Sequence, residues 1–73
     1  MKKTIYTKKH KYLVSQLIKA RKKSMLKQSD VARKLGRTQS YISKMESGQT
    51  RIDIVQLKEL AEIYNKKIDF FIK

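Results

Sequence analysis

The chain has 73 residues, of which 19 are Lys or Arg and 6 are Asp or Glu, so its formal net charge is +13. It contains no Cys, which excludes disulfides and thiolate metal sites, and no apolar run approaches the roughly 20 residues that a membrane-spanning helix needs. We therefore expect one small domain over residues 1–73, in the cytoplasm, with a polyanionic partner and without a metal or other cofactor.

The positive charge is concentrated in the N-terminal half of the chain. Residues 1–40 carry 13 basic side chains and one acidic side chain, Asp30, whereas residues 41–73 carry 6 basic and 5 acidic side chains. Solvated protein surfaces usually mix both signs. The asymmetry therefore predicts a docking face for a polyanion rather than a general excess of charge for solubility.

The first six residues allow three interpretations. They contain Lys2 and Lys3, followed by the short stretch Thr4-Ile5-Tyr6. A basic arm that touches DNA, a disordered tail and a short strand that pairs with a partner chain all fit this sequence. Because terminal residues are poorly ordered unless they are held by the fold, we expect an arm or a disordered tail.

Apolar residues at helical spacing predict the first two helices. The first helix runs from about Thr7 or Lys8 to Lys23. Its inward face consists of three apolar residues, Leu13, Leu17 and Ala20. The second helix runs from about Gln28 to Leu35, and Gly36 ends it because glycine adopts a positive φ without the penalty of a β-carbon.

A third helix is expected to follow at once, from about Gln39 to Ser47. Thr38 is a suitable N-cap because its hydroxyl can accept a hydrogen bond from a free amide of the first turn. Ile42 and Met45 give the helix an apolar stripe, and the rest of its surface is small and polar. Such a surface suits hydrogen bonding to base edges and phosphates. Residues 28–48 are thus predicted to form two short helices joined by a tight turn.

The fourth helix is expected to begin behind Asp53, which forms a capping-box pattern with Gln56. Its buried face consists of Leu57, Leu60, Ala61 and Tyr64. Asn65 is a suitable left-handed residue after its end. A fifth helical turn, about Ile68 to Phe71, carries an apolar cluster of Ile68, Phe70, Phe71 and Ile72. Because a small monomer cannot easily cover this cluster, part of it is a candidate dimer interface. The predicted fold is an all-α, compact domain of five helices.

A set of residues keeps a characteristic spacing over these predicted helices. Its members are Arg21, Gln28, Val31, Ala32, Leu35, Gly36, Thr38, Ile42, Ser43, Glu46, Gly48, Leu57, Leu60, Ala61 and Phe71. Through these residues the stretch from about Leu17 to Phe71 resembles the lambda-repressor-like helix-turn-helix family, also called the XRE or Cro-repressor type. The resemblance implies that the second and third helices form the helix-turn-helix, with the third helix lying in the major groove of DNA.

The resemblance also implies roles for individual polar side chains. Base contacts are expected from the start of the third helix, with Gln39 foremost because a Gln amide can pair with N6 and N7 of adenine. The expected base-contacting residues are Thr38, Gln39, Ser40, Ser43 and Lys44. The expected phosphate-contacting residues are Gln28, Arg37, Tyr41, Ser47, Gln49, Thr50 and Arg51. For Tyr41, packing against the second helix fits equally well.

Arg21 and Glu46 match a family ion pair that ties the first helix to the end of the third. A partly buried, bidentate guanidinium–carboxylate pair would hold the recognition helix at a fixed angle. A pair at the surface would contribute little to stability. We expect the partly buried arrangement.

Three residues depart from the family pattern. Met25 stands where a glycine usually follows the first helix, Lys27 stands where Ser or Thr usually caps the second, and Ile52 replaces a common proline. A non-glycine residue in the left-handed region costs about 1 kcal/mol. We therefore expect that the first helix runs further or that the loop takes another path. Asp30 is expected to offset the missing cap through the helix dipole.

The expected function is that of a sequence-specific transcriptional regulator, a homodimer on a near-palindromic operator of double-stranded DNA. An antitoxin or a restriction-modification controller that binds its own operon fits the same class. An antitoxin would need a toxin-binding surface, such as the apolar end formed by the last two helices. Neither a membrane partner nor a small-molecule effector site is expected.

Two other classes of function fit the sequence less well. A basic helical protein could bind RNA or an anionic membrane without specificity, but the six aromatic residues lie mostly at predicted core or terminal positions, and the apolar face of the first helix is needed for the core. An enzyme is not expected, because the chain has no Cys nucleophile and its single histidine, His10, lies in a lysine-rich stretch.

Overall fold

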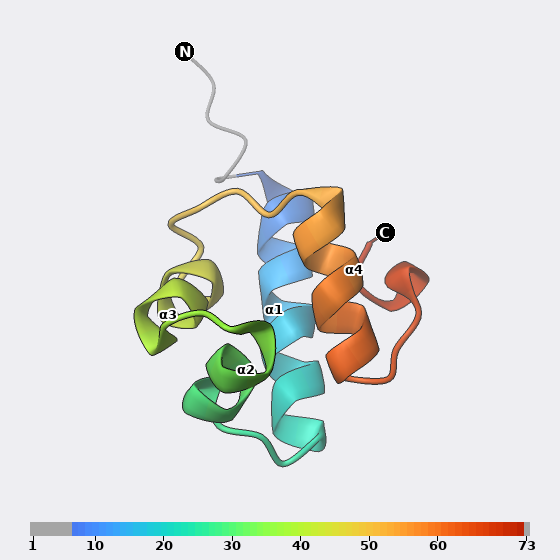
Figure 1. The fold of residues 1–73 in the computed structure, drawn as a ribbon. Helices are drawn as coiled ribbons and strands as arrows, with labels where there is room; N and C mark the ends of the chain where they lie inside the picture. Colours follow the sequence, from blue (N-terminus) through green and yellow to red (C-terminus); the bar gives the residue numbers. More distant parts are fainter. Residues whose placement is uncertain (1–6, 73) are drawn as a thin grey trace.

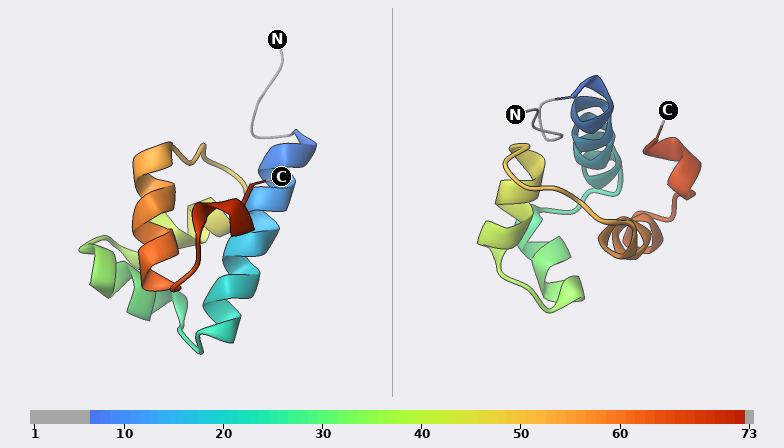
Figure 2. Two further views of the ribbon diagram at one scale, coloured as in Figure 1. Left: turned by 90° about the vertical axis from the view of Figure 1, so that its right-hand side faces the viewer. Right: turned by 90° about the horizontal axis from the view of Figure 1, so that it is seen from above.

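The computed structural model describes residues 7–72, and within them the all-helical prediction is confirmed. Four α-helices follow one another, and a short 3-10 turn comes last. The elements are α1 (Lys8–Lys23), α2 (Gln28–Leu35), α3 (Gln39–Glu46), α4 (Ile54–Ile63) and η2 (Ile68–Phe70). Figure 1 shows α1 as the longest element, with α2 and α3 on one side of it and α4 with η2 on the other. Seen from above, the elements are arranged around a common centre (Figure 2).

The expected fifth α-helix is wrong, because this segment forms only the 3-10 turn η2. The amide of Phe71 donates to the carbonyl oxygen of Ile68 at 2.9 Å, three residues back, so no α-helical turn is closed. The amide of the buried Gln16 side chain donates to the carbonyl oxygen of Phe70 at 3.0 Å. A run of three residues forms too few hydrogen bonds to offset the unfavourable free energy of nucleating an α-helix.

The core is formed by apolar side chains from every element. The most deeply buried large side chains are those of Leu17, Val31, Ile42 and Phe71. The apolar C-terminal cluster mostly joins this core, since Phe71 is 0% exposed and Ile68 and Phe70 pack against it. Ile72, at 51% exposure, is the member of the cluster left at the surface. The expectation that this cluster is too apolar for a monomer to cover therefore holds for one side chain only.

Each of the four α-helices ends in the same left-handed turn. The residues with positive φ are Met25, Gly36, Gly48 and Asn65, and each lies one or two residues after the last residue of a helix. After α2, for example, the amide of Arg37 donates to the carbonyl oxygen of Ala32 at 2.8 Å, as in a Schellman motif. Glycine or asparagine occupies three of these positions, as the sequence predicted.

The fourth position is occupied by Met25, and here both expected alternatives are wrong. Helix α1 ends at Lys23, and Met25 itself adopts the left-handed conformation with φ 60°. Both hydrogen bonds of the turn are present. The amide of Met25 donates to the carbonyl oxygen of Lys22 at 3.0 Å, and the amide of Leu26 donates to the carbonyl oxygen of Arg21 at 3.2 Å. The side chain is 89% exposed, so no packing offsets the backbone strain.

The start of α2 lacks a side-chain cap, as expected from Lys27. Asp30 in the first turn replaces it by hydrogen bonding as well as by charge, since its Oδ2 accepts from the backbone amide of Lys27 at 2.8 Å. At α4 both halves of the predicted capping box are present. The amide of Gln56 donates to Asp53 Oδ1 at 2.8 Å, and the amide of Asp53 donates to Gln56 Oε1 at 2.9 Å.

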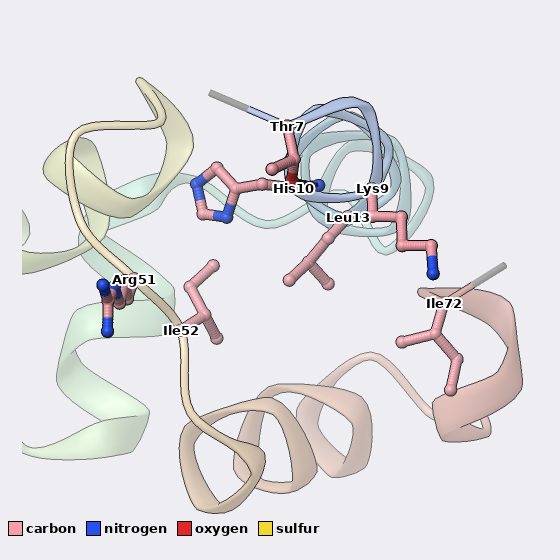
Figure 3. A pocket seen from close by; sticks show the side chains of 7 residues that line it. All are labelled: Thr7, Lys9, His10, Leu13, Arg51, Ile52 and Ile72. Atoms are coloured by element: carbon pink, nitrogen blue, oxygen red, sulfur yellow. Dashed lines mark hydrogen bonds between the residues drawn. The ribbon is translucent and has the colours of Figure 1, made fainter. Parts of the chain in front are cut away.

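The packing leaves a surface hollow of about 300 Å³ between the start of α1 and the linker from α3 to α4 (Figure 3). It lies beside the last described residue, Ile72. Among residues 7–72 no helix is long and apolar enough to cross a membrane.

The strain at Met25 predicts that Met25→Gly stabilises the protein. Glycine adopts the left-handed region without the β-carbon clash, so the free energy of unfolding should rise by about 1 kcal/mol. Urea denaturation followed by circular dichroism measures this change. Met25→Ala is the matched control, because it removes the exposed side chain but keeps the β-carbon, and it should leave stability nearly unchanged. An equal gain in both variants would show that the exposed side chain, not the backbone, is responsible.

Candidate nucleic-acid interface

Helices α2 and α3 form a rigid pair joined by the turn at Gly36. Val31 and Ala32 of α2 and Ile42 and Met45 of α3 are buried in the common core. The predicted N-cap of α3 is present, since Thr38 Oγ1 accepts a hydrogen bond from the amide of Tyr41 at 3.2 Å. The pair therefore presents the opposite face of α3 to solvent at a fixed angle.

The five expected base-contacting residues all lie on this outer side and are exposed. They are Thr38, Gln39, Ser40, Ser43 and Lys44. Because residues four apart lie on the same face of a helix, residues 39, 40, 43 and 44 form one strip along α3. The strip offers amide, hydroxyl and ammonium groups and no aliphatic side chain. It has the chemistry needed to hydrogen-bond to base edges.

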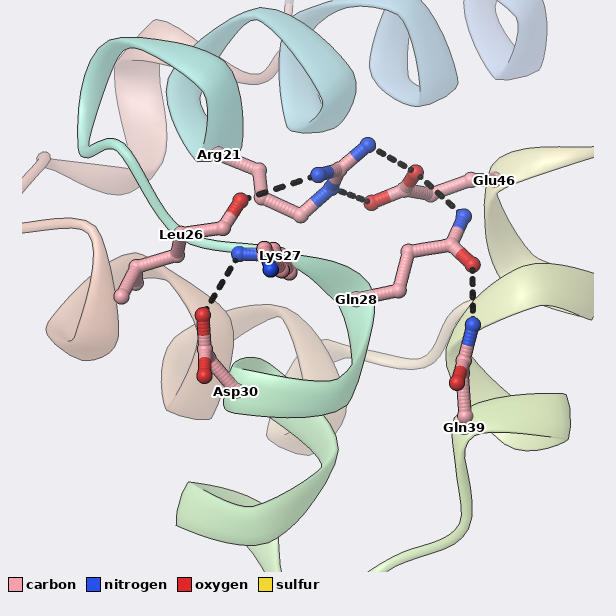
Figure 4. Close-up of polar contacts among 7 residues, drawn as sticks. All are labelled: Arg21, Leu26, Lys27, Gln28, Asp30, Gln39 and Glu46. Atoms are coloured by element: carbon pink, nitrogen blue, oxygen red, sulfur yellow. Dashed lines mark hydrogen bonds and ion pairs between the residues drawn. The ribbon is translucent and has the colours of Figure 1, made fainter.

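The structure brings Arg21 and Glu46 into a bidentate pair (Figure 4). Arg21 Nε donates to Glu46 Oε2 at 2.7 Å and Arg21 Nη2 donates to Glu46 Oε1 at 3.0 Å. The third guanidinium nitrogen, Nη1, donates to the carbonyl oxygen of Leu26 at 2.9 Å. The two side chains are 13% and 7% exposed, so the pair ties α1 to the end of α3 in a partly dry environment.

The hydrogen bonds continue from Glu46 to the expected base-reading residue. Gln28 Nε2 donates to Glu46 Oε1 at 3.0 Å, and Gln39 Nε2 donates to Gln28 Oε1 at 3.4 Å. Figure 4 shows Gln28 between the other two side chains. The sequence does not predict this link, although Gln28 and Gln39 are the first residues of the two helices that the turn joins. Gln28 therefore positions Gln39 in addition to any contact of its own.

The chain of hydrogen bonds fixes which way the Gln39 amide points. Glu46 is a pure acceptor, so Gln28 turns its NH₂ group to Glu46 and its oxygen to Gln39. Gln39 must then use one N–H on Gln28, which leaves its other N–H and its oxygen for a ligand. One donor beside one acceptor is the pattern that complements N7 and N6 of adenine.

Like Gln28, the expected phosphate-contacting residues Tyr41 and Arg37 make contacts within the fold. Tyr41 is half-buried, and its hydroxyl accepts from Gln56 Nε2 at 2.7 Å, which ties α3 to α4. The guanidinium of Arg37 lies 5.0 Å from the centre of the Tyr41 ring. Tyr41 thus bonds to α4, whereas its second interpretation was packing against the second helix, and its ring supports Arg37 at the turn. The sequence predicts only the capping role of Gln56 and not its hydrogen bond to Tyr41.

Four further expected phosphate-contacting residues lie around the end of α3, namely Ser47, Gln49, Thr50 and Arg51. Ser47 is exposed, and its hydroxyl donates to the carbonyl oxygen of Lys44 at 3.0 Å. Gln49 and Arg51 are exposed, whereas Thr50 is half-buried. The linker therefore presents one freely placed cation, Arg51, next to the outer face of α3.

Burial and charge shift two pKa values around the ion pair. The hydrogen bond to Glu46 raises the pKa of Arg21, although burial acts in the opposite direction. Burial raises the pKa of Tyr64 far above its ordinary value, and the carboxylate of Glu46 adds to this rise. Both shifts favour the protonated forms at neutral pH, so Arg21 is charged and Tyr64 is neutral.

Within residues 7–72 no group of three His, Asp or Glu side chains is placed to hold a metal ion. The segment that was expected to act as a basic arm or tail, residues 1–6, lies outside the described part of the chain.

The arrangement of α2, the tight turn and the outward-facing α3 is that of a helix-turn-helix domain. A family model described as helix-turn-helix matches residues 17–71, which is most of the chain. The chain belongs to this family, the XRE-type, lambda-repressor-like helix-turn-helix proteins, and it is a DNA-binding regulatory domain. A comparison with curated protein sequences gives no match.

Solved structures support the fold. The crystal structure of Fe(II) HppE in complex with substrate superposes with a TM-score of 0.76 at 19% sequence identity, over 84% of this chain and 36% of that one. The chain thus corresponds to about a third of that protein. At this identity the likeness concerns the fold alone, and the iron and the substrate are features of that protein.

The geometry of the ion pair predicts that Glu46→Ala is strongly destabilising. Removing the carboxylate leaves the guanidinium of Arg21 without its partner, which should lower the free energy of unfolding by about 3 kcal/mol. Thermal and urea denaturation measure the loss. Arg33→Ala is the control, because it removes the exposed pair with Asp30 (3.2 Å) and should cost less than about 1 kcal/mol. Similar losses in the two variants would contradict the partly buried role of Glu46.

The raised pKa of Tyr64 predicts a loss of stability at alkaline pH. In the unfolded chain tyrosine releases its proton near pH 10, whereas the folded protein retains it. The folded state then binds more protons, so stability falls as pH rises above 10, by about 1 kcal/mol over the first unit. Tyr64→Phe cannot ionise and should lack this component of the fall. Parallel pH dependences of unfolding in the two proteins would contradict the prediction.

Proposed function

We propose that the protein is a sequence-specific transcriptional regulator that inserts α3 into the major groove of double-stranded DNA. The observation that carries this proposal is the strip of exposed polar side chains along α3, held at a fixed angle by the link from Arg21 through Glu46 and Gln28 to Gln39. A strip that served only solubility would need no such support from three helices. The single-domain organisation over residues 1–73 is part of the same proposal.

In this proposal the residues of the strip have graded roles. Gln39 reads an adenine through its free oxygen and N–H, while Ser40, Ser43 and Lys44 contact neighbouring base edges. Thr38 begins the strip, and its hydroxyl proton remains available because the oxygen acts only as acceptor in the cap.

Phosphate contacts flank the strip at both ends. At one end lie Gln28, at the start of α2, and Arg37 with Tyr41. At the other end lie Ser47, Gln49, Thr50 and Arg51. The positive dipole end of α2 and the cations Arg37 and Arg51 favour the DNA backbone at these positions. The excess of positive charge in residues 1–40 adds a salt-dependent attraction to any duplex.

We further propose that two copies bind a near-palindromic operator. An eight-residue helix is about 12 Å long and spans only a few base pairs, so one copy reads a half-site. A symmetric dimer doubles the sequence read and places two half-sites about one helical turn apart. The exposed Ile54 and Val55 at the start of α4 are apolar surface that such a dimer can cover.

Selection from a random duplex library with the purified protein, at a stated moderate salt concentration, tests the proposed function. The expected result is enrichment of a short, near-palindromic site. Strong binding without any enriched site would contradict sequence specificity and leave a basic protein that binds nucleic acid nonspecifically.

Two variants test the assigned roles on the selected site. Gln39→Ala should lose roughly 1 to 3 kcal/mol of binding free energy and relax the preference at one base pair. Arg51→Ala should weaken binding to all sequences alike and reduce the salt dependence by about one counterion. Fluorescence anisotropy at several salt concentrations, with single-base variants of the site, measures both effects. Identical behaviour of the two variants would show that these roles are wrong.

A further inference from the structure

Helix α1 has an outer side that neither the core nor the proposed DNA contacts use. The buried Leu17 turns the inner side of the helix toward the core. One flank is held by Arg21, which bonds to Glu46 on α3. The other flank is held by Gln16, which bonds to the carbonyl oxygen of Phe70 in η2. Figures 1 and 2 show no described element beyond α1 on its remaining side, so this side faces solvent.

The outer side of α1 carries a line of exposed lysines. Because an α-helix turns by about 100° per residue, positions 8, 11, 15, 19 and 22 fall on one line along it, with position 23 beside them. The exposed lysines at these positions, together the lysine face, are Lys8, Lys11, Lys19, Lys22 and Lys23. Position 15 is the exposed Ser15. The 16 residues of α1 give this face a length of about 24 Å.

The stability of the helix does not account for this charge. Helix α1 has seven basic side chains and no acidic one, so no ion pair within the helix neutralises them. Lys8 lies at the helix start, where the dipole disfavours a cation, and Lys19 repels Lys22 and Lys23 three and four residues on. Among the ion pairs formed within residues 7–72, none involves a member of the lysine face. The face is therefore free to bind a polyanion.

The chemistry of the lysine face selects among polyanions. A helix that binds a membrane surface needs exposed apolar side chains, and the line through positions 8 to 22 has none. Protein interfaces are poor in lysine and depend on aromatic anchors. Lysine acts as a point charge that contacts phosphates without reading bases. A face about 24 Å long spans roughly seven base pairs at about 3.4 Å each, so it fits the backbone of duplex DNA.

We propose that the lysine face binds the phosphate backbone of a second DNA duplex while α3 occupies the first. Leu17 of α1 and Ile42 of α3 are buried in the same core, so the outer sides of the two helices point in different directions (Figure 2). Lys11 lines a hollow with Ser47 at the end of α3 and lies at the near edge of the face. Lys8 and Lys19 lie further around the helix, away from α3.

The protein thus joins two duplexes, one chosen by sequence through α3 and one held by charge through α1. The joining of a selected site to a second duplex rests on the proposed function, whereas binding at the lysine face does not. This role also explains why the excess of positive charge in residues 1–40 is greatest on α1 and not on the recognition helix, which carries a single cation, Lys44.

An NMR titration of the full chain with a short duplex of random sequence tests the face. The test variant carries Lys8→Gln and Lys19→Gln. The control carries Lys58→Gln and Lys67→Gln, which remove the same charge from exposed lysines outside α1. In the wild type and the control, amides along the outer side of α1 should shift and saturate in addition to those of α3. In the test variant the α1 shifts should be largely lost while the α3 shifts remain. Equal α1 shifts in both variants would overturn the proposal.

The joining of two duplexes is measured by energy transfer. A donor dye labels the duplex selected in the library experiment, which saturates the protein, and an acceptor dye labels a duplex without that site. Transfer should appear with the wild type and with the Lys58 and Lys67 control. The Lys8 and Lys19 variant should bind the second duplex about tenfold more weakly, with a salt slope smaller by about two, while its affinity for the selected duplex stays within about twofold. Absence of transfer with the wild type, or its retention in the test variant, would overturn the second site.

A competition identifies the class of polyanion. Unlabelled random duplex should displace the acceptor duplex at a lower charge concentration than poly-glutamate does at the same ionic strength. More effective displacement by poly-glutamate would assign the face to an acidic protein and overturn the DNA proposal. If library selection finds no preferred site, the proposed function fails, while the NMR titration still decides whether the lysine face binds DNA.

Discussion

The carboxylate of Glu46 is the point at which the helices of the DNA-binding unit meet. It accepts two hydrogen bonds from Arg21 on α1 and one from Gln28 on α2, while its own backbone closes α3. A partly buried carboxylate is unfavourable unless donors compensate its negative charge. The donors from Arg21 and Gln28 therefore determine where the Glu46 side chain lies. The angle of α3 and the orientation of Gln39 both follow from that position. Glu46 thus connects the stability of the domain with the proposed recognition of DNA.

This arrangement explains how a chain of 73 residues holds the exposed strip on α3, the proposed reading surface, in a defined position. A domain of this size buries a smaller fraction of its unfolded surface than a larger domain does, so apolar packing alone would leave α3 weakly oriented. The hydrogen bonds from Gln56 to Tyr41 and from Gln16 to Phe70 connect further elements. Hydrogen bonds at the edge of the domain therefore add to the apolar core in fixing the orientation of the helices.

The sequence was sufficient for the parts of the fold that depend on local patterns. The four helices, the caps at Thr38 and Asp53 and the left-handed ends at Gly36 and Asn65 follow from spacing and from residues with strong conformational preferences. The fifth helix was wrong because an apolar cluster does not distinguish an α-turn from a 3-10 turn. The outcome at Met25 was also missed, since the two bonds that close the turn outweigh the strain of one residue.

The candidate site was predictable in its composition but not in its connections. The exposed strip on α3 follows from amphipathic spacing, whereas the bonds that join Gln28 to Glu46 and Gln39 depend on how two helices cross. The hollow around His10 could not be predicted from the sequence either, because the residues that line it come together only in the folded chain.

The strained turn after α1 also has a practical consequence. Met25 is almost fully exposed, and the chain contains no cysteine. Met25→Cys therefore introduces a unique thiol at which a fluorophore can be attached. The labelled residue lies one position from Leu26, whose carbonyl oxygen is held by Arg21. A dye at this position sits at the edge of the polar network without replacing any of its members, and it can report changes there during binding.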